Sequence, residues 1–198
     1  MVETRMALEV GTKQKAIREA HLLLQKYGWS GFSFQDLAEV LGIKKPSLYA
    51  HFDSKEALGI DLVDNYRVSF SNWVETLSEM DPDQRLSAFF DMFYKFSQKG
   101  ALYCPLSSFA AELHSLPPAM KKKLKHTYDM QTAWLKKIMI DGQAQDMFRK
   151  DIHADELVDY TISIAIGSLF TARITSDPEK IKSMKSKVLL FLKSGALQ

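Results

Sequence analysis

Apolar residues recur every three or four positions along almost the whole chain, and this spacing limits the possible folds more than any other feature. It is typical of amphipathic helices, because 3.6 residues complete one turn and return a side chain to the same face. In residues 12–27 the repeating positions are Ile17, Ala20, Leu24 and Tyr27. No stretch alternates apolar and polar residues for long enough to form a sheet. The sequence therefore predicts an all-α protein.

Residues typical of helix ends divide this pattern into about nine helices. Ser33 and Ser54 indicate helix starts, because their hydroxyls can accept hydrogen bonds from first-turn amides. Gly28 and Gly42 indicate helix ends, because glycine readily adopts the positive φ found there. The helices expected near the N-terminus and in mid-chain cover about residues 12–27, 45–52 and 105–116, with a frayed arm over residues 1–11.

The composition is that of a globular protein. Of the 198 residues, 46% are hydrophobic and 25% are charged, which excludes disorder as the main state. One cysteine, Cys104, excludes an intramolecular disulfide framework and fits a reducing compartment. Residues 1–15 lack a secretory signal, and no apolar run reaches the roughly 20 residues of a membrane span. We therefore expect a cytoplasmic protein with no membrane partner.

The net charge is +2, and the whole basic excess lies in the first quarter of the chain. Residues 1–55 hold eight Lys and Arg against six Asp and Glu, whereas residues 56–198 hold eighteen of each. An excess this mild fits a nucleic-acid partner and a solvated surface equally well. A second basic run is interpreted as the solvated face of a helix, with an acidic or phosphate partner as the alternative: Lys121, Lys122, Lys123 and Lys125.

Residues 34–52 have the pattern of a helix-turn-helix. Ala38 is small where the second helix crosses the first, and Gly42 supplies the positive φ of a tight turn. The wedge between the two helices is filled by Leu37, Leu41, Ile43 and Leu48. Two short helices cannot cover their own apolar face, so the helix over residues 12–27 is expected to pack on them. Such a motif places its second helix in the major groove, and the pattern predicts a DNA-binding protein.

This segment resembles the N-terminal domain of the TetR family of bacterial transcriptional repressors over about residues 12–60. The resemblance rests above all on the string Leu48-Tyr49-Ala50-His51-Phe52-Asp53-Ser54-Lys55-Glu56-Ala57-Leu58. It implies a homodimer whose subunits have a DNA-binding head and a ligand-binding body, here residues 1–54 and 55–198. One departure is Lys44-Lys45, which stands where the family commonly has a Ser or Thr cap.

The predicted DNA-binding residues lie in or next to the helix-turn-helix. A helix start such as that at Ser33 suits a phosphate, and Lys45 and Ser47 can hydrogen-bond base edges. The resemblance implies phosphate contacts for Tyr49 and His51, although a half-buried ring and a structural histidine are the alternatives. The full set is Ser33, Lys44, Lys45, Pro46, Ser47, Tyr49, His51 and Lys55.

The resemblance also implies an effector pocket and a dimer interface in the body. Its many Met and aromatic residues can line an adaptable pocket, although an ordinary helical core has the same composition. The predicted ligand-binding residues are Phe93, Cys104, Phe109, Glu112, Tyr128 and Trp134. The predicted interface lies on the last two helices, with the alternative that these residues pack only within one subunit: Tyr160, Ile164, Gly167, Ser168, Thr171, Met184, Val188 and Phe191.

Cys104 has two interpretations. It precedes Pro105 and is expected at the N-cap of a helix, where unpaired amides and the helix dipole stabilise a thiolate. A subgroup of the family that resembles this segment senses electrophiles or oxidants with such a cysteine. The alternative is a small buried apolar residue, which the lack of a second thiol favours.

The predicted function is a ligand-responsive homodimeric repressor, released from a double-stranded DNA operator by a small apolar or electrophilic effector. A DNA-binding protein of the same fold without an effector is the alternative. An enzyme is not expected, because the chain has no His-Glu-x-x-His, Gly-x-Ser-x-Gly, P-loop or glycine-rich nucleotide turn. No cofactor or metal is expected. The operator sequence, the effector and the regulated genes stay open at this point.

Overall fold

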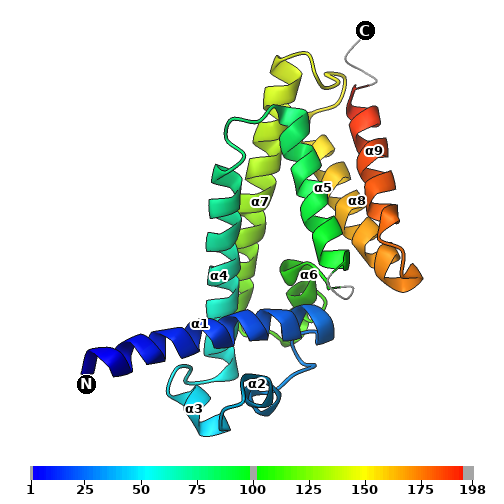
Figure 1. Cartoon of the computed structure of the whole chain (residues 1–198). Coiled ribbons are helices and arrows are strands. Elements are labelled where there is room, and N and C mark those ends of the chain that lie inside the picture. Colours follow the sequence, from blue (N-terminus) through cyan, green and yellow to red (C-terminus); the bar gives the residue numbers. More distant parts are fainter. Residues whose placement is uncertain (1, 99–101, 194–198) are drawn as a thin grey trace. The chain divides into compact units, whose positions relative to one another are not determined.

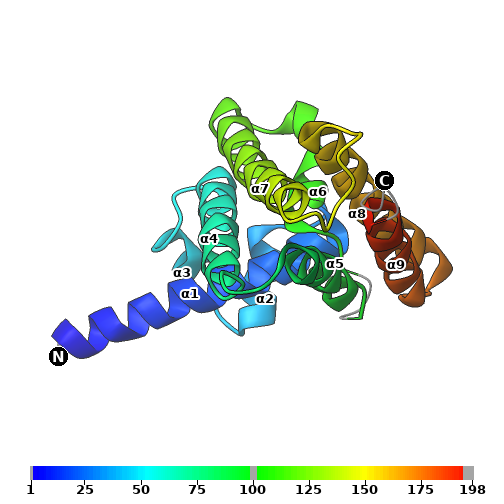
Figure 2. The ribbon, with the colours of Figure 1, turned by 90° about the horizontal axis from the view of Figure 1, so that it is seen from above.

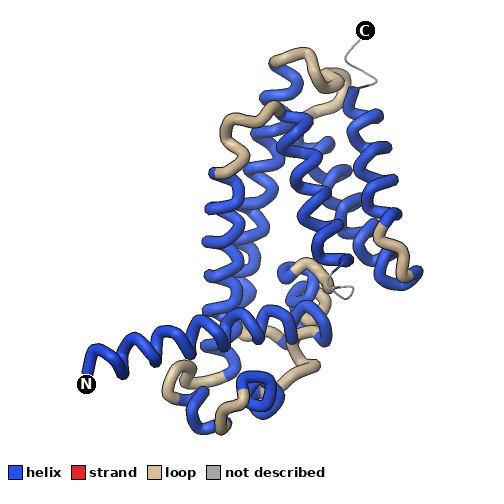
Figure 3. Tube along the Cα trace, in the orientation of Figure 1, coloured by secondary structure: helices blue, strands red, loops and turns tan. Residues whose placement is uncertain are grey.

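The computed structural model describes residues 2–98 and 102–193, in which helices alternate with turns and there is no strand (Figures 1 and 3). The prediction of an all-α protein is confirmed. The helices are α1 (Val2–Tyr27), α2 (Phe34–Leu41), α3 (Lys45–Tyr49), α4 (Lys55–Glu75), α5 (Pro82–Gln98), α6 (Pro105–Ala110), α7 (Pro118–Ala144), α8 (Ala154–Thr175) and α9 (Glu179–Lys193), with a short 3-10 helix, η1 (Leu113–Ser115), between α6 and α7.

Some helix boundaries differ from the sequence prediction. α1 begins at Val2, so the segment predicted to fray is helical. α3 ends at Tyr49 rather than near residue 52, and a turn follows in which the amides of His51 and Phe52 both donate to the carbonyl of Leu48. α6 is also shorter than predicted and is followed by η1.

The chain forms two compact units. The head unit comprises Met1–Ser71 and Pro105–Thr127, and the body unit comprises Asn72–Cys104 and Tyr128–Gln198. Packing thus assigns α6 and the first parts of α4 and α7 to the unit that contains the helix-turn-helix. The boundary predicted between residues 54 and 55 separates DNA binding from ligand binding instead of packing units, and it stays a prediction.

α1 covers the core of the head unit. It packs on α2 and α6, and three members of its predicted apolar stripe, Ile17, Ala20 and Leu24, are buried. The fourth member, Tyr27, is 54% exposed, so this part of the prediction is wrong. At 100° per residue, Tyr27 lies about 80° around the helix from Ile17, at the edge of the stripe.

In the body unit, α5 packs on α8 and α9, and α8 packs on α9. α8 and α9 lie side by side in both ribbon views (Figures 1 and 2). Phe89, Phe90 and Phe93 of α5 are buried, as the apolar spacing predicts. The aromatic spacing of α5 therefore describes a packed core in this unit.

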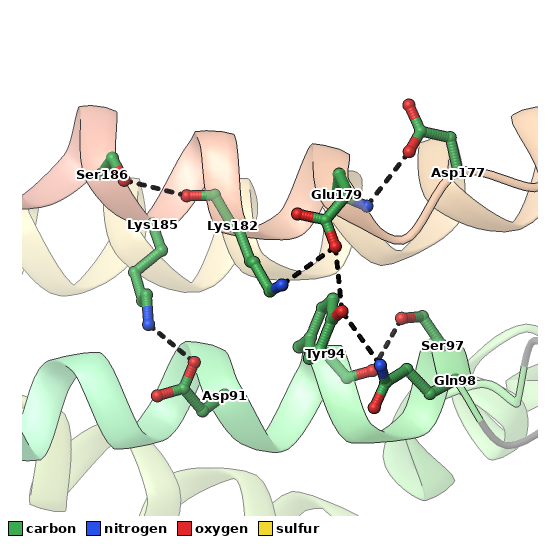
Figure 4. A network of polar contacts seen from close by, with 9 residues as sticks. All are labelled: Asp91, Tyr94, Ser97, Gln98, Asp177, Glu179, Lys182, Lys185 and Ser186. Atoms are coloured by element: carbon green, nitrogen blue, oxygen red, sulfur yellow. Dashed lines mark hydrogen bonds and ion pairs between the residues drawn. The ribbon is translucent and has the colours of Figure 1, made fainter.

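Hydrogen bonds and an ion pair join α9 to α5 (Figure 4). The hydroxyl of Tyr94 donates to Glu179 at 2.9 Å, and the same carboxylate accepts from Lys182 at 2.9 Å. Hydrogen bonds from Lys182 and Tyr94 hold the pKa of Glu179 below its usual value. Lys185 pairs with Asp91 at 2.7 Å, one turn further along both helices. Ion pairs at or near the surface stabilise a fold little, so these contacts add to the packing of α9 on α5 and do not replace it.

Among the described helices, α8 is the one with the length and hydropathy of a membrane span. Its most apolar stretch has a mean hydropathy of 1.3, and 44% of that stretch is buried in the structure. A core helix or an interface helix of a soluble protein meets the same criteria. The apolar character of α8 is therefore weak evidence for a membrane.

His21 of α1 is held in a confined environment in the head unit. Its side chain hydrogen-bonds to Asn65 of α4. Its Nε2 atom is buried and has no hydrogen-bond partner among the described residues. Burial lowers the pKa of His21 to about 4, and the bond to Asn65 offsets only part of this effect.

We expect His21 to make folding depend on pH. Its ordinary pKa is 6.5, so between pH 6.5 and about 4 the unfolded chain binds the proton more tightly. Acidification from about pH 7.5 to about pH 5 should lower the free energy of unfolding by about 2 kcal/mol through this residue. Urea denaturation of the wild type and His21→Gln at both pH values measures the effect. A variant with undiminished pH dependence would contradict this expectation.

Candidate nucleic-acid interface

Ser33 begins α2 with a reciprocal cap. Its hydroxyl accepts hydrogen bonds from the amides of Gln35 and Asp36 at 3.1 and 3.3 Å, and the Asp36 carboxylate accepts the Ser33 amide at 2.7 Å. The predicted cap is confirmed. The hydrogen bonds from the Ser33 hydroxyl and amide lower the pKa of Asp36. The charged Asp36 opposes an anion at this helix start, so the phosphate contact of Ser33 stays a prediction.

Gly42 makes the turn that joins α2 to α3. Its φ of 65° lies in the left-handed region, and its amide donates to the carbonyl of Glu39 at 3.1 Å. The amide of Ile43 donates to the carbonyl of Ala38 at 3.0 Å, which completes the cap of α2. Ala38 itself is buried. The positive φ predicted for the turn glycine is confirmed, and the burial of Ala38 agrees with a small residue at the helix crossing.

α3 presents its first turn to solvent and buries the residue that follows. The group from Lys44 to Ser47 is exposed along its whole length, whereas Leu48 is fully buried. Pro46 lies in the first turn, and Lys44 occupies the N-cap without a side-chain capping bond. The ammonium groups of Lys44 and Lys45 and the hydroxyl of Ser47 thus lie together at the start of α3, which the buried Leu48 holds in place. Such groups can bind phosphates and base edges.

Tyr49 is the last residue of α3, and His51 lies in the turn that follows. Tyr49 is exposed over half of its surface, and its ring meets that of Phe34 edge-on at 5.2 Å. His51 is half-buried, and its ring centroid lies 6.3 Å from that of Phe52. The contact with Phe34 orients Tyr49 and leaves its other edge in solvent, and the phosphate contacts predicted for both residues stay predictions.

Lys55, the first residue of α4, has partners within the head unit. Its ammonium donates to the backbone carbonyls of Trp29 and Phe32 and lies 4.5 and 4.6 Å from the centroids of their rings. Burial lowers the pKa of Lys55, against the opposing effects of Glu112 and Asp36. Its predicted contact with the DNA backbone stays a prediction, and the structure gives it a second role in holding the loop between α1 and α2.

The six predicted ligand-binding residues are divided between the two units. Phe109 and Glu112 belong to the head unit, where Phe109 packs against Trp29 with ring centroids 5.4 Å apart. The other four belong to the body unit: Phe93, Cys104, Tyr128 and Trp134. Phe93 is buried in the α5 core and Tyr128 is exposed. The six residues therefore do not form one site within either unit.

Trp134 lines a cavity within the body unit. The cavity has a volume of about 340 Å³ and is bounded by α4, α5, α7 and the loop between α4 and α5. Apolar residues alternate with charged ones along its wall, including Arg85, which pairs with Asp141 at 3.3 Å. The rings of Trp73 and Phe89 pack against Trp134 at 5.4 and 6.0 Å.

Cys104 is only 4% exposed. A thiol so enclosed has little access to solvent reagents, which supports the interpretation as a small apolar residue. The residue lies directly before α6, a helix of six residues. The sensing role stays a prediction.

The predicted dimer residues separate into two groups by burial. Ser168 and Val188 are buried within the subunit. The others are exposed or half-buried along α8 and α9: Tyr160, Ile164, Gly167, Thr171, Met184 and Phe191. Four of these line a cleft of about 520 Å³: Ile164, Gly167, Thr171 and Met184. The second group is therefore better placed than Val188 to contact another chain, and Ser168, although buried, also lines the cleft.

Sequence reasoning missed three exposed apolar side chains of α8, two of which are the most exposed large apolar side chains on this helix. Ile166, Phe170 and Ile174 repeat every four residues, and the exposed fractions of Phe170 and Ile174 are 53% and 68%. Leu190 of α9 is also exposed. The four-residue spacing was visible in the sequence, but it does not reveal which of two apolar faces a helix buries in its own subunit.

Comparison with known proteins agrees with this architecture. Residues 16–61 match the family described as Bacterial regulatory proteins, tetR family. Residues 82–188, more than half of the chain, match the family described as Tetracyclin repressor-like, C-terminal domain.

Individual relatives extend over most of the chain. The HTH-type transcriptional repressor DhaR of Mycobacterium sp. (strain GP1) is 25% identical over 175 residues, which cover 85% of this chain and 86% of that protein. The HTH-type transcriptional repressor ComR of Escherichia coli (strain K12) is 24% identical over 186 residues, which cover 91% and 89%. The crystal structure of a TetR family regulator from Agrobacterium tumefaciens has the same fold, with a TM-score of 0.88 and 21% identity over 93% of this chain and 99% of that one.

An all-α fold with a capped helix-turn-helix and an exposed cationic helix start defines a DNA-binding transcriptional regulator. The chain belongs to the TetR family. The regulator and repressor names of its relatives agree with a role in transcription rather than catalysis.

Proposed function

We propose that the protein is a homodimeric repressor that binds a near-palindromic operator through α3 and releases it when a small effector binds. The observation that carries the proposal is the exposed start of α3, with Lys44, Lys45 and Ser47 beside the buried anchor Leu48. A helix presented in this way reads base edges with its first residues. The predicted contacts of Tyr49 and His51 with phosphates complete the proposed surface.

The proposed dimer is supported by the exposed apolar face of α8. Phe170 and Ile174 expose more than half of their surfaces in the single subunit, and Gly167 lies between Ile166 and Phe170 with open space around it. Burial of such side chains against a second copy removes apolar area from water. A dimer also supplies two recognition helices, one for each half of a palindrome.

The proposed effector is small and mostly apolar or aromatic. Trp134 and neighbouring apolar side chains of the body unit bound the cavity of about 340 Å³, a volume within the range of small-molecule sites. The burial of Cys104 favours an apolar effector over an electrophilic one. Release of DNA requires that the effector bind the conformation with low DNA affinity more tightly than the one with high affinity.

Selection of binding sites from random double-stranded DNA tests the proposed function. We expect enrichment of a motif with two related halves, and binding that weakens steeply as salt rises, because phosphate contacts release counterions. Failure to enrich any motif would refute operator binding. Enrichment of a single half-site, together with a monomeric mass in light scattering, would keep DNA binding and refute the dimer.

A further inference from the structure

Glu112 reaches the helix-turn-helix from a part of the chain that is distant in sequence. It lies between α6 and η1, and its two carboxylate oxygens accept the backbone amide of Ser30 at 3.1 and 3.0 Å. Ser30 belongs to the loop that joins α1 to α2. These are charge-assisted hydrogen bonds across 82 residues of sequence, and all of the groups lie in the head unit.

The loop leaves room for this carboxylate. Gly28 has a φ of +84°, and a Cβ atom built on it would lie 2.8 Å from Oε1 of Glu112. Any other residue at position 28 would displace Glu112 or strain the backbone. The glycine therefore serves two purposes, since it ends α1 and admits the carboxylate.

Lys55 binds the carbonyl groups of the same loop. Its ammonium donates to the carbonyls of Trp29 and Phe32, and Glu112 accepts a hydrogen bond from the amide of Ser30, which lies between these two residues in the sequence. The loop is thus bound by a cation at its carbonyls and by an anion at its amide. Burial raises the pKa of Glu112, but hydrogen bonds from the Ser30 side chain and from the amides of Ser30 and Trp29, together with the charge of Lys55, outweigh this effect and hold the pKa below its usual value. Glu112 is therefore ionised at neutral pH.

The loop between α1 and α2 is connected to both helices of the helix-turn-helix. It leads directly into the cap of α2, and Phe34 at the start of α2 contacts Tyr49 at the end of α3. We propose that Glu112 is a positioning residue for DNA binding, which holds the loop between α1 and α2 and thereby the direction in which α3 presents Lys45. This proposal rests on the proposed function, because it presumes that α3 binds DNA.

Simple electrostatics predicts the opposite sign for a substitution of Glu112. Removal of a negative charge from a DNA-binding unit should strengthen binding, because the polyanion is repelled less. If the carboxylate positions the loop, its removal weakens binding instead, since DNA must then order a loop that the protein no longer holds. The direction of the change therefore separates the two roles.

The experiment measures operator Kd and its salt dependence for the full chain with Glu112→Ala and Glu112→Gln. We expect Glu112→Ala to raise Kd about tenfold, the equivalent of one charge-assisted hydrogen bond. Glu112→Gln retains an oxygen that can accept the Ser30 amide, so its Kd should lie between those of wild type and Glu112→Ala. The slope of log Kd against log salt should stay unchanged, because Glu112 contacts no phosphate. Amide hydrogen exchange at Ser30 should be fastest in Glu112→Ala.

Glu56→Gln is the matched control, because Glu56 is an exposed carboxylate of the same unit. It should bind the operator as tightly as wild type or more tightly. If Glu112→Ala does not fold, Glu112→Gln is used for the test. Exchange of the Ser30 amide that is slower than in the unfolded chain shows that this variant folds, and a raised operator Kd then supports the proposal. Glu112 variants that bind as tightly as Glu56→Gln would overturn it. If the wild-type protein binds no DNA sequence selectively, the proposed function itself is refuted.

Discussion

The substitution Ile174→Glu is expected to convert the proposed dimer into monomers and to abolish tight operator binding. Ile174 is 68% exposed in the single subunit, so Ile174→Glu leaves the subunit core intact and places a charge only in the proposed interface. A charge buried there without a partner costs several kcal/mol. Loss of the second recognition helix should then weaken operator binding by roughly a hundredfold or more. Light scattering and an operator titration on the same sample measure both effects.

Gly167→Leu tests the same interface by volume instead of charge. A Cβ atom at position 167 meets no atom within 4 Å in the subunit, and leucine favours a helix over glycine by roughly 1 kcal/mol. The variant should therefore fold at least as stably as wild type and still dissociate. Ile140→Glu on α7, also an exposed apolar residue of the body unit, is the matched control and should stay dimeric. Dimers that persist in both α8 variants would place the interface elsewhere.

The substitution Val188→Glu does not isolate the interface. Val188 is fully buried inside the subunit, where it contributes to the packing of α9. A glutamate there should unfold the body unit before any effect on association is seen. This residue illustrates how an apolar seam inferred from spacing can belong to the inside of one subunit.

Lys45→Ala is expected to weaken operator binding by about 1–3 kcal/mol and to relax base preference at one position of each half-site. Lys45 is exposed at the first residue of α3, next to the buried Leu48, so its removal does not disturb the core. If the ammonium contacts a phosphate instead of a base, preference should persist and the salt slope should fall by about one. Fluorescence anisotropy with operator variants over a salt series distinguishes the two contacts.

Lys122→Ala is the matched control for Lys45→Ala. Lys122 is an exposed lysine of the same unit, on α7, and its loss changes the net charge by the same amount. It should alter Kd only slightly and leave base preference unchanged. Equal effects of the two variants would mean that overall charge, rather than the position of Lys45 on α3, governs binding.

Much of the helix-turn-helix could be predicted because its determinants are local. The Ser33 cap, the positive φ of Gly42 and the small Ala38 each depend on a few neighbouring residues; the structure confirms the first two and buries Ala38. The exposure of Lys44 to Ser47 follows from the same short segment, since only Leu48 of α3 points into the core. Local backbone preferences and apolar spacing are sufficient for such features.

The roles of Lys55, Glu112 and Val188 were decided by contacts between segments far apart in the chain. Lys55 and Glu112 looked like binding residues, yet tertiary packing brings both to the loop between α1 and α2. Likewise, the spacing of α8 marks two apolar faces, and only the packing of α5 and α9 leaves Phe170 and Ile174 exposed. The sequence alone determined the helical fold, the caps and the recognition turn, because these depend on near neighbours. Tertiary structure decided which charges are paired and which faces stay open, because burial depends on the whole unit.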